Sequence, residues 1–176
     1  MNRFIPDATF YTRERDDTIG GDNPFKWVLK TSKDIFLNKR SVVFSLPGAF
    51  TPTCSTFQVP GYEKAYDEIR SLGIDEVYVV SVNDAFVMRK WMIDQGVERL
   101  KALPDGNGDF TRMMGMLVDK SNLGFGYRSW RYSMVVSPDC TIERMFEEPG
   151  IRSCAPGDPY GESSPEVMLD YLKNVK

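Results

Sequence analysis

Two short apolar runs separated by one amphipathic pattern constrain the fold of this chain more than any other feature. Residues 41–46 (Ser-Val-Val-Phe-Ser-Leu) and 77–82 (Val-Tyr-Val-Val-Ser-Val) are apolar without alternation, which is typical of buried strands. Between them, apolar side chains recur at helical spacing, at Tyr62, Ala65, Tyr66, Ile69 and Leu72. Gly73 follows and indicates the end of that helix. A strand, a helix and a strand in this order predict a right-handed crossover and a parallel sheet centre.

The segments around this centre predict the fold class. A second helix should follow residues 77–82, capped by Asn83 or Asp84. We expect its apolar face to carry Phe86, Val87, Trp91 and Met92. Residues 132–136 and 141–146 flank a four-residue turn, which predicts an antiparallel hairpin. Residues 1–30 are polar and interrupted by proline, so we expect an irregular segment there with at most one short strand.

The last helix is predicted from its N-terminal signals. Ser164 is an N-cap residue, Pro165 fits the first helical position, and Glu166 places an acid in the first turn. A βαβ start followed by a hairpin and a helix is the order of a thioredoxin-like α/β fold, with a central mixed sheet flanked by helices. The 176 residues suffice for one domain, so we expect a single domain over residues 1–176.

Composition and charge exclude several classes of protein. No apolar run approaches the roughly 20 residues that a membrane-spanning helix needs, so we expect no membrane partner. The formal net charge of -3 disfavours nucleic-acid binding, which needs clustered Lys and Arg. The first residues, Met-Asn-Arg-Phe-Ile-Pro-Asp, contain no stretch apolar enough for a secretory signal, which predicts a cytoplasmic protein.

The sequence contains three cysteines and no histidine. The absence of histidine removes Cys–His nucleophile pairs, Ser–His triads and every zinc site that includes histidine. Three scattered cysteines, at positions 54, 140 and 154, cannot form a four-cysteine cluster, and we expect no metal and no cofactor. An odd number of widely spaced cysteines also indicates at least one free thiol.

Cys54 has the most informative position of the three. It lies between the end of the first buried strand and the first turn of the following helix, where unpaired backbone N–H groups and the helix dipole favour thiolate. Thr51 stands three residues earlier, so a helical turn would bring its hydroxyl near the sulfur. A structural role is equally compatible with this position, because cysteine is among the most frequently buried residues.

The residues around Cys54 resemble a known family. Pro47-x-x-x-Thr51-x-x-Cys54 resembles the active-site signature of the peroxiredoxins, and residues 44–54 look like their type II subgroup, which includes the atypical two-cysteine enzymes. The resemblance continues through residues 81–87, 103–108, 114–120 and 128–136 in the family's order.

This resemblance implies an activity and a set of site residues. It implies a thiol-dependent peroxidase that reduces hydrogen peroxide and alkyl hydroperoxides, with Cys54 as the peroxidatic thiolate that becomes a sulfenic acid. Arg131 matches the family's active-site arginine, which would stabilise the thiolate and the departing oxygen. Thr51 would hydrogen-bond the peroxide, and Pro47 would shield the pocket. The resemblance also suggests a homodimer packed near the active-site face.

The route by which the sulfenic acid is reduced stays open at the level of sequence. Glutaredoxin with glutathione, or thioredoxin, could supply electrons from outside, and we favour this route. Cys154 lies near the region of the family's resolving cysteine, although not in clean register, and Cys140 is a weaker candidate because a tight turn would restrict it. A redox sensor, or a thioredoxin-fold holdase or binding module without turnover, remains the alternative function.

Overall fold

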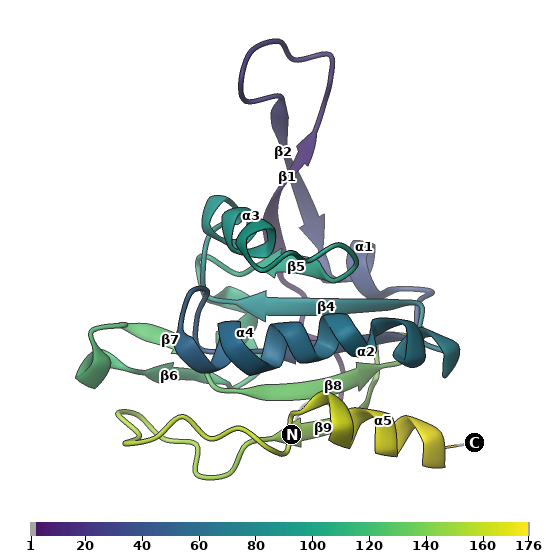
Figure 1. Ribbon diagram of the computed structural model, residues 1–176, viewed down its shortest axis with the longest axis vertical. Coiled ribbons are helices and arrows are strands. Elements are labelled where there is room, and N and C mark those ends of the chain that lie inside the picture. Colours follow the sequence, from purple (N-terminus) through teal and green to yellow (C-terminus); the bar gives the residue numbers. More distant parts are fainter. Residues whose placement is uncertain (1–2, 176) are drawn as a thin grey trace.

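A computed structural model describes residues 3–175 of the chain, built around a five-stranded mixed sheet (Figure 1). The order of the strands across this sheet is β5-β4-β3-β8-β9. Their bounds are β3 Ser41–Ser45, β4 Glu76–Ser81, β5 Lys101–Pro104, β8 Tyr132–Val136 and β9 Ile142–Glu147. Strands β3, β4 and β5 run parallel, whereas β8 and β9 add antiparallel strands on the other side of β3. The predicted thioredoxin-like α/β fold is confirmed.

Both faces of the sheet are covered, which explains why its central strands carry no polar alternation. Phe44 packs on one face, where its ring stacks on Tyr62 with centroids 4.1 Å apart. Its neighbour Val43 points to the opposite face, toward Phe36 and Phe110. The covering helices are α2 Val59–Ser71, α3 Ala85–Asp94 and α5 Pro165–Asn174 on the first face, and α1 Ser32–Phe36 and α4 Asp109–Met113 on the second. Figure 1 shows α2 and α5 lying side by side across the sheet.

The caps of the helices follow the signals in the sequence. The Asp84 side chain accepts a hydrogen bond from the backbone N–H of Val87 at 2.9 Å and caps α3, which settles the choice between Asn83 and Asp84. Ser164 caps α5, with Pro165 at its first position, as predicted. The predicted apolar face of α3 is partly wrong. Phe86 is 54% exposed, and the buried residues are Ala85, Met88, Trp91 and Met92.

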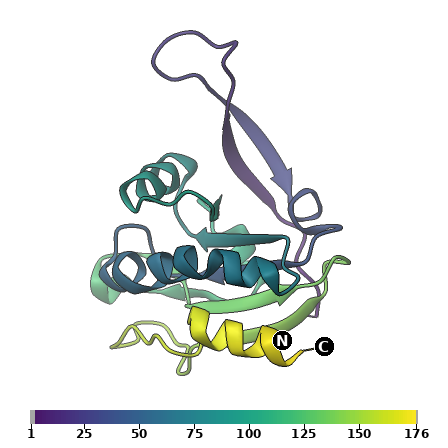
Figure 2. The ribbon, with the colours of Figure 1, turned by 45° about the vertical axis from the view of Figure 1, so that its right-hand side comes forward.

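The expectation of an irregular N-terminal segment is wrong. Strands β1 (Thr9–Arg15) and β2 (Phe25–Thr31) form an antiparallel hairpin that projects from the body of the molecule (Figure 2). Few of its side chains are buried, so the hairpin rests on backbone pairing and on ion pairs across the strands, such as Lys30 with Glu14 at 2.5 Å. Strands of this kind are hard to predict from sequence, because the usual signal is an alternation of apolar and polar residues that marks a buried face.

The remaining elements are short. A second small hairpin consists of β6 (Leu117–Asp119) and β7 (Tyr127–Ser129), with a 3-10 turn at Ser121–Leu123 between its strands. The predicted hairpin of β8 and β9 is confirmed, and its turn places Cys140 in the left-handed region at φ 65°. Among residues 3–175, no helix combines the length and the apolar character that crossing a bilayer requires.

Candidate active site

The connection from β3 to α2 carries Pro47, Thr51 and Cys54. The helix begins at Pro52, because the N–H of Ser55 bonds to the carbonyl of Thr51 at 3.0 Å. A π-helical turn then spans Cys54–Gln58, closed by the N–H of Val59 on the carbonyl of Cys54. Cys54 therefore lies in the first turn of the helix, where backbone N–H groups lack carbonyl partners within the helix. Its side chain is 0% exposed.

Arg131 approaches Cys54 from the start of β8, the strand that pairs with β3. The register that pairs Ser45 with Tyr132 sets Arg131 just beyond the end of β3, beside the connection that leads to Cys54. Its Nη1 donates to the Sγ of Cys54 at 3.5 Å and also to the Oε1 of Gln58. The structure thus brings together the cysteine and the arginine that the sequence singled out, although they lie 77 residues apart.

The guanidinium of Arg131 donates to a third residue besides Cys54 and Gln58. Its Nη2 donates to both carboxylate oxygens of Asp158, each at 2.7 Å, and the ring of Tyr160 lies under the guanidinium. Arg131 is 1% exposed, and this burial alone would lower its pKa. The interactions with Cys54 and with the carboxylate of Asp158 outweigh the burial, so the pKa of Arg131 is raised above its ordinary value. The buried guanidinium is therefore a fixed positive charge beside the sulfur.

Thr51 and Pro47 shape the approach to Cys54. The hydroxyl of Thr51 donates to the carbonyl of Gly48 at 2.7 Å, which leaves its oxygen free to accept a hydrogen bond. Pro47 is buried two residues after the end of β3. The side chain of Asn83 accepts a hydrogen bond from the backbone N–H of Ala49 at 3.0 Å. This bond ties the connection after β3 to the residues that follow β4.

Sequence reasoning missed Gln58 and Asp158, which complete the surroundings of Arg131. Gln58 follows Cys54 by four residues on the same helix, and this spacing could have indicated a shared face. Asp158 lies 27 residues from Arg131 in the loop before α5, so no local pattern could have found it. Glu148 shapes this loop by accepting hydrogen bonds from the backbone N–H groups of residues 161, 162 and 163.

The two other cysteines are held elsewhere. Cys140 follows Val136, which pairs with Ser41 at the end of β3 remote from Cys54. The two cysteines therefore lie toward opposite ends of β3, whose length is roughly 13 Å at about 3.3 Å for each residue. Cys154 is exposed, its backbone N–H donates to the carbonyl of Asp119 at 2.7 Å, and its φ is 52°. All three thiols are free in this structure.

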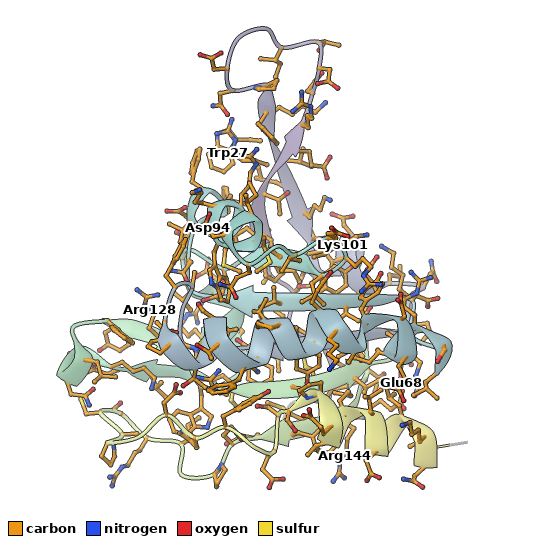
Figure 3. The ribbon with its side chains drawn as sticks, viewed as in Figure 1. Trp27, Glu68, Asp94, Lys101, Arg128 and Arg144 are labelled. Carbon is orange, nitrogen blue, oxygen red and sulfur yellow. The ribbon has the colours of Figure 1, made fainter. Side chains whose placement is uncertain are left out.

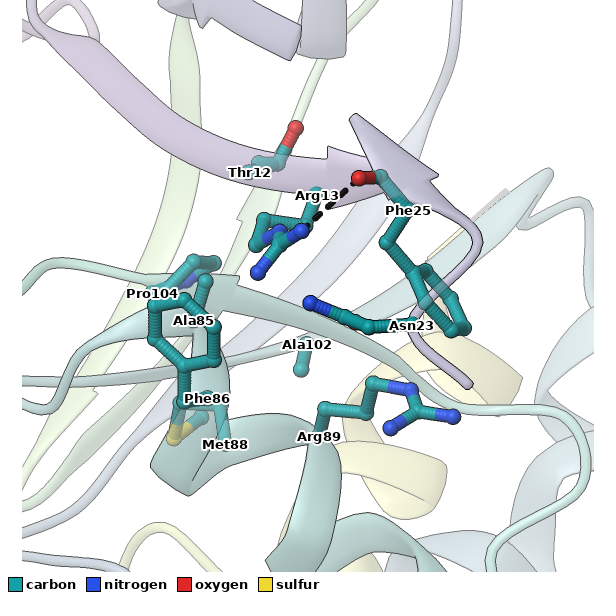
Figure 4. A pocket seen from close by; sticks show the side chains of 10 residues that line it. All are labelled: Thr12, Arg13, Asn23, Phe25, Ala85, Phe86, Met88, Arg89, Ala102 and Pro104. Atoms are coloured by element: carbon teal, nitrogen blue, oxygen red, sulfur yellow. Dashed lines mark hydrogen bonds between the residues drawn. The ribbon is translucent and has the colours of Figure 1, made fainter. Parts of the chain in front are cut away.

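A separate cavity of about 260 Å³ lies between the β1–β2 hairpin and α3 (Figure 4). None of the site residues above lines it. Two arginines do, and each places its guanidinium over an aromatic ring, Arg13 over Phe86 and Arg89 over Phe25. Within residues 3–175, no three His, Cys, Asp or Glu side chains lie close enough together to hold a metal ion.

The junction around Cys54 indicates a class of protein. A cysteine at a helix N-terminus beside a fixed positive charge is primed as a nucleophile, so this fold and site define a thiol-dependent oxidoreductase.

Comparison with known proteins narrows this class. The Redoxin family matches residues 28–154. A peroxiredoxin of Sinorhizobium fredii is 54% identical over 98% of this chain and 92% of its own length. The crystal structure of a Plasmodium falciparum antioxidant protein, a 1-Cys peroxiredoxin, superposes with a TM-score of 0.91 at 35% identity, covering 99% of this chain and 100% of that one. The crystal structure of reduced Prx3 of Vibrio vulnificus in complex with hydrogen peroxide superposes with a TM-score of 0.83 at 32% identity. The superposition covers 97% of this chain and 96% of that one.

The chain belongs to the peroxiredoxins, which are thiol peroxidases of the redoxin family. Thiol-dependent reduction of peroxide is therefore its activity at the level of the family.

Proposed function

We propose that this chain reduces hydrogen peroxide and alkyl hydroperoxides, with Cys54 as the attacking thiolate and an external thiol as the reductant. One observation carries the proposal: the Nη1 of Arg131 lies 3.5 Å from the Sγ of Cys54, and both side chains are buried. A fixed guanidinium at this distance favours the thiolate in the absence of any histidine.

The first step breaks the peroxide bond. The thiolate of Cys54 attacks the terminal oxygen, an S–O bond forms, and the O–O bond breaks. The departing hydroxide or alkoxide takes a proton from solvent and leaves as water or alcohol, while the cysteine becomes a sulfenic acid. Arg131 stabilises the charge that moves from sulfur to the departing oxygen. Thr51 accepts a hydrogen bond from the hydroperoxide and holds it in line with the sulfur.

The second step needs a thiol from outside the chain. Cys140 lies near the end of β3 remote from Cys54. The loop of Cys154 is held by the backbone bond of Cys154 to Asp119 and by the pairing of Asp158 with Arg131, and both oppose its movement toward Cys54. We therefore propose that glutathione with glutaredoxin, or thioredoxin, reduces the sulfenic acid. The description of the Plasmodium relative as a 1-Cys peroxiredoxin supports this choice.

A panel of electron donors tests the proposal. Peroxide consumption should be sustained with glutathione plus glutaredoxin, or with thioredoxin plus its reductase, and it should be abolished in Cys54→Ser. The Cys154→Ser variant is the matched control and should keep turning over. Activity in Cys54→Ser would contradict the role of Cys54 as the attacking thiolate. Loss of activity in Cys154→Ser with every donor would contradict reduction by an external thiol.

We further propose a homodimer that packs near the active-site face. Phe50 and Phe57 flank Cys54 in sequence, yet they are 52% and 59% exposed. Large apolar side chains on one exposed face are typical of an interaction surface. Light scattering should report twice the monomer mass, and Phe57→Glu should shift the protein toward monomer. A monomeric wild-type protein at micromolar concentration would contradict this.

A further inference from the structure

A second arginine lies against the active-site connection. Arg128 belongs to β7, and its side chain lies at the edge of the molecule where the chain enters α2 (Figure 3). A Cβ placed on Gly48 would lie 2.8 Å from the Nη1 of Arg128 and 3.4 Å from the Cγ2 of Thr51. The guanidinium of Arg128 and the side chain of Thr51 therefore both lie close to Gly48.

Arg128 differs from Arg131 in lacking a carboxylate. Its Nε donates to the carbonyl of Phe125 at 3.0 Å, and its Nη1 lies 3.4 Å from the carbonyl of Val82. In the described part of the chain, no Asp or Glu forms an ion pair with it, and its Nη2 has no hydrogen-bond partner. The side chain is half-buried, and this burial lowers the pKa of Arg128. An uncompensated, partly desolvated cation favours an anion from outside the chain.

We propose that Arg128 binds the carboxylate of the thiol that reduces oxidised Cys54. The inference rests on the proposed function and names the chemical class of the reductant. Arg131 cannot serve this purpose, because it is buried and already paired with Asp158. Arg128 is a partly exposed cation beside this site, and a bidentate guanidinium suits a carboxylate.

The step that Arg128 assists is balanced without any further reagent. The sulfur of the incoming thiol bonds to the Sγ of Cys54, and the S–O bond of the sulfenic acid breaks. The oxygen leaves as water with the proton of the thiol. The sulfur of Cys54 is reduced, the sulfur of the thiol is oxidised, and a mixed disulfide results. A carboxylate held by Arg128 orients the thiol for this attack.

The test compares two thiols that differ only in charge. The protein is oxidised with one equivalent of hydrogen peroxide and mixed with N-acetylcysteine or with N-acetylcysteine amide, and the rate constant of mixed-disulfide formation is measured. The ratio of the two rate constants is then compared between variants, so the intrinsic reactivity of each thiol cancels. Arg128→Met should reduce the preference for the carboxylate about tenfold, as expected for loss of a charge-assisted contact. Arg128→Lys should keep part of it.

Two further variants separate recognition from structure. Gly48→Ala leaves Arg128 in the chain but places a Cβ where its guanidinium lies, so it should also lower the ratio. Arg15→Met removes an exposed arginine of the hairpin that pairs with Asp17, and it should leave the ratio unchanged.

The outcomes distinguish this inference from the proposed function. An unchanged ratio in Arg128→Met, or an equal slowing with both thiols, would assign Arg128 a structural role and overturn the inference. If the wild-type protein forms no sulfenic acid on Cys54, the proposed function is wrong and the inference fails with it.

Discussion

Replacement of Arg131 by methionine should separate catalysis from folding. Methionine fills much of the same volume but removes the charge beside the Sγ of Cys54. It also leaves Asp158 without its partner and the Oε1 of Gln58 without its donor. The stability of the fold should fall only moderately, because the Asp158 side chain that loses its partner is 37% exposed and solvent screens its charge. An unpaired amide oxygen costs roughly 1–3 kcal/mol.

The expected loss of activity follows from one distance. Two unit charges 3.5 Å apart interact by roughly 5 kcal/mol at an effective dielectric constant of about 20. Loss of that interaction disfavours the thiolate of Cys54 and the charged transition state. At about 1.4 kcal/mol for each factor of ten, the rate constant for peroxide should fall by roughly a thousandfold.

Stopped-flow fluorescence can follow this reaction. Trp91 is buried, and its Nε1 donates to the hydroxyl of Ser55 at 2.9 Å, next to Cys54, so its emission should report oxidation of the thiol. Arg131→Lys keeps a positive charge but loses the planar guanidinium that donates to Cys54, Gln58 and Asp158. Its rate constant should lie between those of wild type and Arg131→Met. Arg112→Met, an exposed arginine paired with Asp109, is the control.

The reasoning would be refuted by a folded Arg131→Met protein with a rate constant within about threefold of wild type, since the 5 kcal/mol estimate predicts a far larger loss. Urea unfolding must accompany the kinetics, because a misfolded variant would also lose activity. A midpoint close to that of wild type shows that the activity, and not the fold, has been tested.

Three further predictions concern other parts of the molecule. Thr51→Val should slow peroxide reduction at least tenfold in stopped-flow, whereas Thr51→Ser keeps the hydroxyl and should stay within a few-fold of wild type. Cys140→Ser should leave the steady-state peroxidase rate unchanged; a large loss would contradict the remote position of Cys140. Hydrogen bonds from Arg40 hold the pKa of Glu143 below its ordinary value of 4.5. The stability that this depressed pKa contributes is present above pH 4.5 and is lost as pH falls through the lower folded-state value. Glu143→Gln should therefore lower the free energy of unfolding by about 1 kcal/mol or less at pH 7, and the two urea midpoints should converge in acid; a gap that persists there would contradict this.

The central fold could be predicted because its information is local. The runs that form β3 and β4 are buried on both faces, so they lack alternation, and the caps at Asp84 and Ser164 lie within a few residues of the helices they start. The β1–β2 hairpin was missed because most of its side chains are exposed or partly exposed. A signal existed, since Phe25, Trp27 and Leu29 alternate with polar or smaller residues along β2.

The site could be predicted only in part. The position of Cys54 at a strand–helix junction is readable from its neighbours, whereas the choice of Arg131 came from the resemblance to a family. Its placement beside Cys54 depends on the register of β8 on β3, which no local pattern encodes. The same holds for Asp158, which the loop before α5 brings to Arg131.

The most direct test of the account is to identify the thiol that peroxide oxidises. The protein should be treated with one equivalent of hydrogen peroxide at neutral pH in the presence of a sulfenic-acid trap, and the trapped peptides mapped by mass spectrometry. The account predicts the label on the peptide that contains Cys54, with Cys140 and Cys154 still reduced. A label on either of those two cysteines with Cys54 unmodified would contradict it.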